Sequence, residues 1–285
     1  MSAPPVLVLG APFSGAAPLA RALGAHPSLY ALPQLNLFMA DRVSELIDMY
    51  ALSQGAHGDG LLRAIAQLHW HGQTDATIGA ARKFLAEHEH WSGAELLDDL
   101  AARAAPRRLL LADTESPLRP LDLRRIAALP GAVLIHVTRH PYAQGLMHEA
   151  WLRSRLFVPP DFKDHFHTPA RIEPQLGWLR ANRNLDQHVA AALRVRIEDC
   201  VGDAPALDDI GRLLDLPESA ATGAGAFEGY GPTAAPYGLD DELVAEFATS
   251  LTEQAQRGTL VSIPPWIDAG FAAEVSALAR RYGYR

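Results

Sequence analysis

The sequence predicts an α/β protein, a three-layer sandwich with a central parallel sheet and helices on both faces. Short apolar runs at Val6–Gly10, Arg108–Ala112 and Ala132–Thr138 are typical of buried parallel strands. Segments with helical periodicity follow the strands. Because strands that alternate with helices form parallel sheets, we expect right-handed crossovers and a ligand cleft at the carboxyl ends of the strands.

The other elements follow from periodicity and from breaker residues. A further short strand is expected over Leu193–Ile197, and loops are expected over Val158–Pro174 and Gly223–Gly238, which are rich in Pro or Gly. No repeat or linker divides the chain, so we expect one domain over residues 1–285 with a helical insertion around residues 40–105. The predicted helices are Leu19–Leu23, Leu35–Ile47, Leu61–Ala104 with breaks near Gly72 and Gly93, Pro141–Leu152, Leu176–Ala192, Asp208–Leu214, Asp241–Gln256 and Ala269–Arg281.

Composition narrows the possible partners. Hydrophobic residues make up 48% and charged residues 20% of the chain, which is ordinary for a globular protein. The net charge of −8 argues against a nucleic-acid-binding surface, and no apolar run is long enough to predict a membrane span. The chain does not open on a signal peptide pattern, and it has a single cysteine, Cys200. We therefore expect a cytoplasmic protein without nucleic-acid or membrane partners.

The turn after the first strand, Gly10 to Ala17, has the arrangement that presents backbone N–H groups and a helix N-terminus to an anion. Gly10 and Gly15 have the spacing of a Walker A loop, but Ala16 and Ala17 stand where that loop needs Lys and Ser or Thr. The Gly-x-Gly-x-x-Gly pattern of dinucleotide-binding proteins is absent. These departures argue against ATP or GTP hydrolysis, and a plain structural turn stays open as the alternative.

A basic residue follows the run Ala132–Thr138. Arg139 lies at the expected strand end, and the fork of donors on Arg suits a phosphate, whereas a surface ion pair is the alternative. Histidines at alternate positions, the pattern of some metal sites, occur at His69 and His71, His88 and His90, and His165 and His167. No third ligand is indicated for any of these pairs, so we expect no metal.

Several short motifs, taken in order, resemble the sulfotransferase family, especially bacterial members found with polyketide and peptide assembly lines, and tyrosylprotein sulfotransferases. The family's first motif resembles Gly-x-Pro-Arg-Ser-Gly-Thr-Thr, followed by a helix, His-Pro and a Pro-Glu-Leu-type segment. The similarity spans Val6 to Leu216. The matching segments are Gly10–Ala17, His26-Pro27, Pro33–Phe38, Glu115-Ser116-Pro117, Arg139–Tyr142, Trp178 with Asn182, and Arg196–Asp199.

The resemblance implies a P-loop-like sulfotransferase fold and a donor, 3′-phosphoadenosine-5′-phosphosulfate. It implies that Arg139, with the residue eight positions later, Met147, holds the 3′-phosphate. It places Gln34 at the position of a proposed general base. The residues that it implies around the 5′-phosphosulfate are Pro12, Phe13, Ser14, Gly15, Ala16 and Ala17.

The chain departs from the family pattern at these same positions. Phe13 replaces a cation, Ala16 and Ala17 replace two hydroxyls, and Met147 replaces a Ser. Gln34 replaces the Glu of the presumed base, and an amide takes no proton at neutral pH. In addition, Glu115 stands where a Lys is usual. Each lost charged phosphate contact costs about 1.5–3 kcal/mol. The sequence therefore predicts a degenerate active site.

Two interpretations stay open. In the first, the protein is a sulfotransferase-like enzyme that transfers a sulfuryl group to a small-molecule or carrier-bound acceptor, as part of natural-product biosynthesis. His148 or Glu149, on the helix after Arg139, would then supply the base in place of Gln34. In the second, the fold has lost the donor, has no cofactor, and serves a different reaction or binds an apolar ligand or a partner.

Overall fold

The computed structural model describes residues 3–53, 55–153, 163–166, 168, 170–200, 205–216 and 267–284. The loop predicted over 223–238, the helix predicted over 241–256, and His167 lie outside these residues. Within the described ranges, no helix combines the length and the apolar character needed to cross a lipid bilayer.

Among the described residues, five parallel strands form the central sheet, in agreement with the predicted fold class. The strand order is β2-β3-β1-β4-β7, so β1 lies in the middle between β3 and β4. The loop that follows β1 therefore lies beside the loop that follows β4. The strands are β1 (Val6–Gly10), β2 (Leu29–Leu32), β3 (Arg108–Asp113), β4 (Val133–Thr138) and β7 (Leu193–Arg196).

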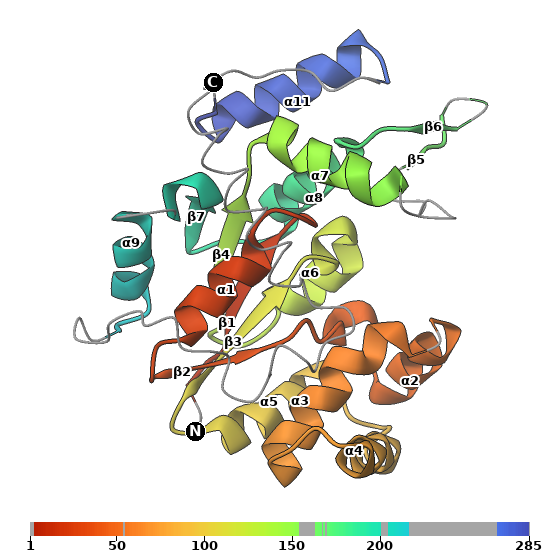
Figure 1. Ribbon diagram of the computed structural model, residues 1–285, viewed down its shortest axis with the longest axis vertical. Coiled ribbons are helices and arrows are strands. Elements are labelled where there is room, and N and C mark those ends of the chain that lie inside the picture. The colour runs from red at the N-terminus through yellow and green to blue at the C-terminus, as the bar shows by residue number, and fades with distance from the viewer. Residues whose placement is uncertain are drawn as a thin grey trace.

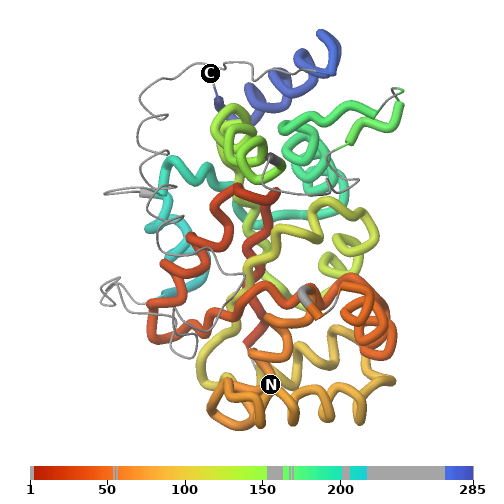
Figure 2. The backbone as a smooth tube through the Cα atoms, turned by 45° about the vertical axis from the view of Figure 1, so that its right-hand side comes forward, coloured from red at the N-terminus to blue at the C-terminus, as the bar shows by residue number. Residues whose placement is uncertain are grey.

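Alternate residues of β1 face opposite helical layers. Val6 and Val8 pack with α1 (Ala16–Gly24) and α9 (Pro205–Leu213) on one face of the sheet. Leu7 and Leu9 belong to the larger core on the other face, which includes residues of α3 (Asp59–Trp70), α5 (Gly93–Ala104) and α6 (Pro120–Ala127). Figures 1 and 2 show these helices on the two sides of the sheet. Because every β1 side chain is buried, the strand is uniformly apolar rather than alternating.

The chain forms a group of helices after β2 and before β3. It consists of α2 (Val43–Leu52), α3, α4 (Asp75–Glu87) and α5, and it gathers at one end of the molecule in Figure 1. Local capping sets where two of these helices begin. Thr74 accepts a hydrogen bond from the Thr77 N–H, and Ser92 accepts one from the Glu95 N–H. These caps account for the breaks that the sequence predicts near Gly72 and Gly93.

One element was missed by the sequence analysis and another was mispredicted. The strand β2 was not predicted, because four apolar residues are too few to show a period. The helix predicted over Leu35–Ile47 is instead a short 3₁₀ turn, η1 (Leu37–Met39), followed by α2. Asn36 adopts a left-handed conformation with φ of 50°, and the Tyr50 hydroxyl donates to the Leu35 carbonyl at 3.1 Å. A tertiary contact thus holds this segment out of a regular helix.

The remaining elements lie mostly at the carboxyl ends of the strands. Helix α7 follows β4, and α8 packs against both α7 and α11 (Figure 1). Within the loop predicted before α8, β5 and β6 form a short antiparallel pair. The bounds are η2 (Ala56–Gly58), η3 (Ser116–Leu118), α7 (Pro141–Arg153), β5 (Lys163–Asp164), β6 (Arg171–Ile172), α8 (Leu176–His188), η5 (Ile197–Cys200) and α11 (Ala269–Arg281).

Candidate active site

The loop between β1 and α1 reverses the chain direction within five residues. The Ser14 N–H donates to the Ala11 carbonyl at 2.9 Å, and Phe13 and Gly15 have positive φ angles of 64° and 93°. A Cβ atom at Gly15 would lie 2.4 Å from Cγ1 of Ile197. Glycine is therefore required here by both conformation and space. The turn directs the chain into α1, whose first backbone N–H groups have no intrahelical acceptors and favour an anion.

Arg139 lies directly beside this loop. Its side chain is fully buried, and one terminal nitrogen lies 3.4 Å from the Phe13 carbonyl oxygen. The backbone carbonyl of Arg139 accepts a 2.8 Å hydrogen bond from the Trp178 indole. Burial lowers the pKa of Arg139 to about 10, opposed by the charge of Glu198. The side chain therefore stays cationic at neutral pH, next to the turn that leads into α1.

Met147 contacts this cation, and aromatic side chains pack around the ring of the adjoining Phe13. The sulfur of Met147 lies 2.7 Å from a terminal nitrogen of Arg139. The rings of Phe13 and His148 meet edge to face with centroids 4.9 Å apart, and the Trp151 ring lies 6.2 Å from Phe13. The two substitutions by Phe13 and Met147 that the sequence revealed thus come together in space.

The other predicted loop residues take different positions. Ser14 is buried, and its hydroxyl is 3.4 Å from the Ala16 N–H. The Pro12 carbonyl accepts a 2.7 Å hydrogen bond from Gln144. Ala16 is fully buried in the core beneath α1, whereas Ala17 is exposed. Of the two alanines, Ala17 is therefore the position where a hydroxyl side chain could fit and reach a ligand.

Gln34 lies after the end of β2, three strands along the sheet from β4, which Arg139 follows. Its side-chain nitrogen donates to Asn36 at 2.8 Å, and its oxygen accepts from the Thr114 hydroxyl at 2.9 Å. The amide thus ties the carboxyl ends of β2 and β3 together. Glu115, in the next turn, lies 3.7 Å from the Arg119 guanidinium, so a neighbouring cation already balances its charge.

His148 and Glu149 lie in the middle of α7. The His148 ring is fully buried and interacts with the backbone of Pro174. Burial and the nearby Arg139 charge lower the pKa of His148 to about 3. This imidazole is therefore neutral at physiological pH and only weakly basic. Glu149 is partly exposed.

A carboxyl group that the sequence analysis missed lies next to His148. Glu173 is fully buried just before α8, and one of its oxygens accepts the Gln175 N–H at 3.0 Å. Burial, reinforced by the negative charge of Glu149, raises its pKa to about 7. A carboxyl that titrates near neutrality is typical of acid–base catalysts. No motif marks Glu173. The Pro that follows it, at the start of a helix, is the one local signal.

The raised pKa makes a prediction about stability. The unfolded chain ionises Glu173 near the usual 4.5, whereas the folded chain keeps the proton until about pH 7. Glu173 therefore favours folding at low pH, and its contribution is lost as the pH rises through 7, by up to about 3 kcal/mol. Glu173→Gln should remove this pH-dependent loss of stability. Urea denaturation at pH 5 and pH 8 measures the free energy of unfolding of each protein. The control is Glu87→Gln, at an exposed position of α4. Equal pH dependence in all three proteins would contradict the assignment.

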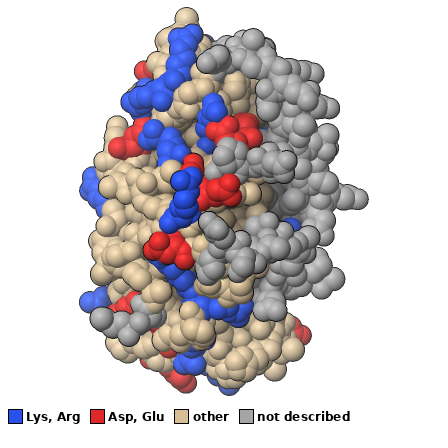
Figure 3. All heavy atoms as spheres, turned by 90° about the vertical axis from the view of Figure 1, so that its left-hand side faces the viewer, with Lys and Arg blue, Asp and Glu red and all other residues tan. Residues whose placement is uncertain are grey.

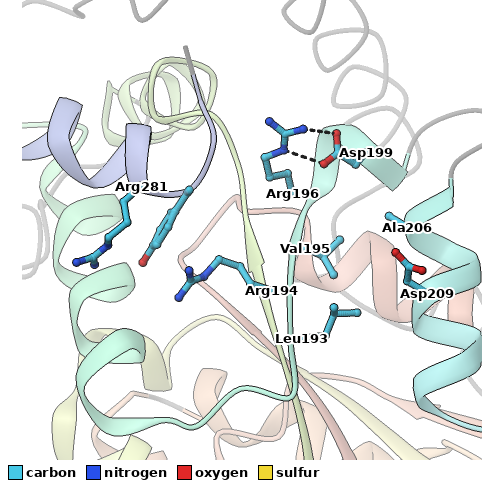
Figure 4. Close-up of a pocket in the computed structure, with 9 residues that line it drawn as sticks. Leu193, Arg194, Val195, Arg196, Asp199, Ala206, Asp209 and Arg281 are labelled. Carbon is cyan, nitrogen blue, oxygen red and sulfur yellow. Dashed lines mark hydrogen bonds and ion pairs between the residues drawn. The ribbon is translucent and has the colours of Figure 1, made fainter.

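Two pockets lie away from this site, along the outer strand β7. The first has a volume of about 270 Å³ and lies between β7, α9 and the end of α11 (Figure 4). The second, of about 380 Å³, shares Arg194 with it. Carboxylates hold the arginines of the first pocket: Arg196 bonds Asp199 through 2.7 and 2.8 Å contacts. On the face that includes α1 and α9, charges of both signs are interspersed (Figure 3). These pockets therefore lack the unpaired cations of an anion site.

Glu198 and Tyr284 lie close enough to Arg139 to influence its pKa. The Tyr284 hydroxyl donates to Glu198 at 3.1 Å, and the other Glu198 oxygen accepts the His140 N–H at 2.7 Å. The rings of Tyr284 and His140 meet edge to face. Cys200 follows Glu198 on the same turn, and burial raises its pKa to about 12, as expected for an inert thiol.

Comparisons with known proteins address the fold. No family model matches the chain, and no curated protein matches it. Among solved structures, the chain is similar over its full length to the sulfotransferase domain of the olefin synthase of Synechococcus PCC 7002. The TM-score is 0.74 and the identity 21%, and the match covers 97% of that domain.

The chain has a sulfotransferase fold. A second similar structure is the sulfotransferase domain from the curacin biosynthetic pathway, with a TM-score of 0.73, 21% identity, and coverage of 99% of this chain and 98% of that domain. A more distant one is a sulfotransferase from Alicyclobacillus acidocaldarius, with a TM-score of 0.50, 14% identity, and coverage of 100% and 98%. The sulfotransferase fold that the motifs predict is thus confirmed, whereas the roles of individual residues are not tested by this similarity.

Proposed function

We propose that the protein transfers a sulfuryl group from 3′-phosphoadenosine-5′-phosphosulfate to a hydroxyl or amine of a small-molecule or carrier-bound acceptor in secondary metabolism. The observation that supports this most directly is the convergence of two anion-binding features. The turn into α1 and the Arg139 guanidinium lie side by side, with 3.4 Å between an Arg139 nitrogen and the Phe13 carbonyl. The structural similarity to domains of the olefin synthase and of the curacin pathway favours an acceptor of that biosynthetic kind.

The residues present fit the donor in part. The backbone of the loop and the N-terminus of α1 suit a phosphate, and Arg139 supplies one buried cation. The hydroxyls and the second cation of the family pattern are absent, because Phe13, Ala16, Ala17 and Met147 carry none. When bound, the donor supplies an activated sulfuryl group. Arg139 and the loop would orient its phosphates and exclude water, and we expect weak rather than tight binding.

A second candidate function rests on the contact between Met147 and Arg139. The thioether sulfur lies 2.7 Å from a terminal nitrogen of the guanidinium, an N–H group that a phosphate would otherwise bind. With Phe13 against His148, the region offers apolar walls. A fold that has exchanged the donor for an apolar ligand or partner would have this arrangement.

Calorimetric titration with adenosine 3′,5′-bisphosphate, the desulfo donor, separates the two functions. We expect saturable heat in the millimolar range or below. Arg139→Gln should abolish this heat, since it removes the cation, whereas Arg212→Gln, at an exposed position of α9, should leave it unchanged. Circular dichroism checks that each protein is folded. An absence of heat from the folded wild-type protein at millimolar ligand would reject donor use and favour the second function.

A further inference from the structure

Tyr284 is placed by the way in which helix α11 ends. The Tyr284 N–H donates to the Ala279 carbonyl and the Gly283 N–H to the Arg280 carbonyl, both at 3.0 Å. Gly283 has a φ of 84°. Two bonds of these spans around a left-handed glycine form the Schellman motif, which closes many helices. This motif directs the chain so that Tyr284 is buried, at 6% exposed.

A second set of contacts holds the same segment against the end of β7. The Gly283 carbonyl accepts a 2.9 Å hydrogen bond from Arg196, and Asp199 holds the same guanidinium through bonds of 2.7 and 2.8 Å. The Arg196 guanidinium also lies 5.7 Å from the centroid of the Tyr284 ring. Tyr284 is thus held through its backbone and its ring, and its hydroxyl donates to Glu198 at 3.1 Å.

Glu198 joins this segment to the strand end that carries Arg139. Its other oxygen accepts the His140 N–H at 2.7 Å. The preceding residue, Ile197, packs so closely on the loop after β1 that a Cβ at Gly15 would lie 2.4 Å from its Cγ1 atom. Arg139 and Glu198 each influence the pKa of the other through charge. A carboxylate therefore lies beside the candidate donor site.

A carboxylate in this place opposes the binding of an anion. If Glu198 paired with the Arg139 guanidinium, it would compete with a phosphate for the same N–H groups. In the structure, its two oxygens are instead engaged by the His140 N–H and the Tyr284 hydroxyl, and Arg139 acts on it through its charge. The two donors thus decide where this carboxylate lies relative to the cation.

We propose that Tyr284 is a positioning residue, whose hydroxyl holds Glu198 at the end of β4 and so keeps it from pairing with the Arg139 guanidinium. This proposal rests on the proposed use of 3′-phosphoadenosine-5′-phosphosulfate, whose phosphate Arg139 would bind. Without the hydroxyl, one Glu198 oxygen loses its donor and needs a replacement. Arg196, a second cation nearby, is already held in its own contacts, so the released carboxylate would turn to Arg139.

Tyr284→Phe tests this restraint, because it removes the hydroxyl and keeps the ring. We expect the affinity for adenosine 3′,5′-bisphosphate, measured by calorimetry, to fall about 10-fold. Tyr282→Phe is the matched control, since Tyr282 is equally buried and its hydroxyl donates to the Asn182 carbonyl at 3.2 Å. In urea the control should lose a similar free energy of unfolding, and it should bind as the wild type does. If Tyr284→Phe binds as tightly as Tyr282→Phe, the proposal is overturned.

A second substitution separates positioning from a general loss of packing. Adding Glu198→Gln to Tyr284→Phe removes the competing negative charge, so we expect the double variant to regain at least the wild-type affinity. Glu198→Gln alone should bind the bisphosphate as tightly as the wild type or more tightly, and it decides the matter if Tyr284→Phe does not fold. Weaker binding by Glu198→Gln, or a double variant as weak as Tyr284→Phe, contradicts the positioning role.

The restraint can also be measured without the donor. In protein labelled with ¹⁵N at arginine, the side-chain N–H signal that is missing from Arg139→Gln belongs to Arg139. It should move in Tyr284→Phe, where the ion pair forms, and keep its position in Tyr282→Phe. If the wild type binds no bisphosphate, the proposed function fails and this signal decides the positioning role. If the wild type binds and the signal stays in place in Tyr284→Phe, the proposed function stands and the positioning role is wrong.

Discussion

Restoring the missing anion contacts should raise the affinity for adenosine 3′,5′-bisphosphate by about 3.5–5 kcal/mol, or between about 300-fold and about 4000-fold. The variant combines Phe13→Arg, Ala17→Thr and Met147→Ser. Phe13→Arg adds one charge-assisted contact, worth about 1.5–3 kcal/mol, and each new hydroxyl adds about 1 kcal/mol. Met147→Ser also removes the sulfur that lies 2.7 Å from Arg139. The backbone of the loop already has the required turn, with φ of 64° at Phe13 and 93° at Gly15.

The structure refines how this experiment is done. Ala16 is fully buried, so Ala16→Thr should overpack the core at a cost of about 1–3 kcal/mol and belongs in a separate variant. Phe13→Leu with the same two hydroxyl substitutions is the matched control, since it changes the ring without adding charge. Glu115→Lys should add a further small gain by removing a negative charge. If the reverted protein is folded and gives no heat with the bisphosphate, the loop positions do not correspond to those of the family.

Trp178→Ala should lower the free energy of unfolding by about 3–5 kcal/mol. Trp178 is fully buried in α8 and packs with Phe271 and Val275 of α11. Its indole also donates to the Arg139 carbonyl at 2.8 Å. The substitution therefore opens a cavity and leaves a buried carbonyl unpaired beside the candidate site. Urea denaturation monitored by circular dichroism measures the change.

Two further variants separate the causes of this loss. Trp178→Phe keeps most of the packing and removes the hydrogen bond, so it should cost about 1–3 kcal/mol. Trp70→Ala, at a position 41% exposed on α3, should cost about 1 kcal/mol or less. If Trp178→Ala is no more destabilising than Trp70→Ala, the contact between α8, α11 and the end of β4 contributes little to stability.

Much of the fold was predictable because its signals are local. The runs at Val6–Gly10 and Ala132–Thr138 are apolar since their strands are covered on both faces. Helix α11 has the predicted bounds, Ala269–Arg281. The errors occur where a distant residue overrides local preference, as when Tyr50 of α2 bonds the Leu35 carbonyl and holds that segment out of a helix.

The candidate site was predictable in part for the same reason. A Gly-containing turn after the first strand and an Arg after another strand are visible in the sequence, and parallel strands bring their ends to one edge. What the sequence could not show is the orientation of the side chains. Met147 was expected only as a missing Ser, and its contact with Arg139 depends on how α7 lies across the strand end.

By itself, the sequence determined the α/β class, the turn from Gly10 to Gly15 and the presence of Arg139 at a strand end. Apolar runs, glycine spacing and the order of motifs are properties of neighbouring residues, so they are visible without coordinates. Only the tertiary structure decided which carboxyl group is chemically unusual. The pKa of Glu173 rises because burial disfavours its charged form and the negative charge of Glu149 lies nearby, and these effects outweigh the backbone hydrogen bonds from Gln175 and Ile267. Burial by segments far away in the chain leaves no local pattern in the sequence.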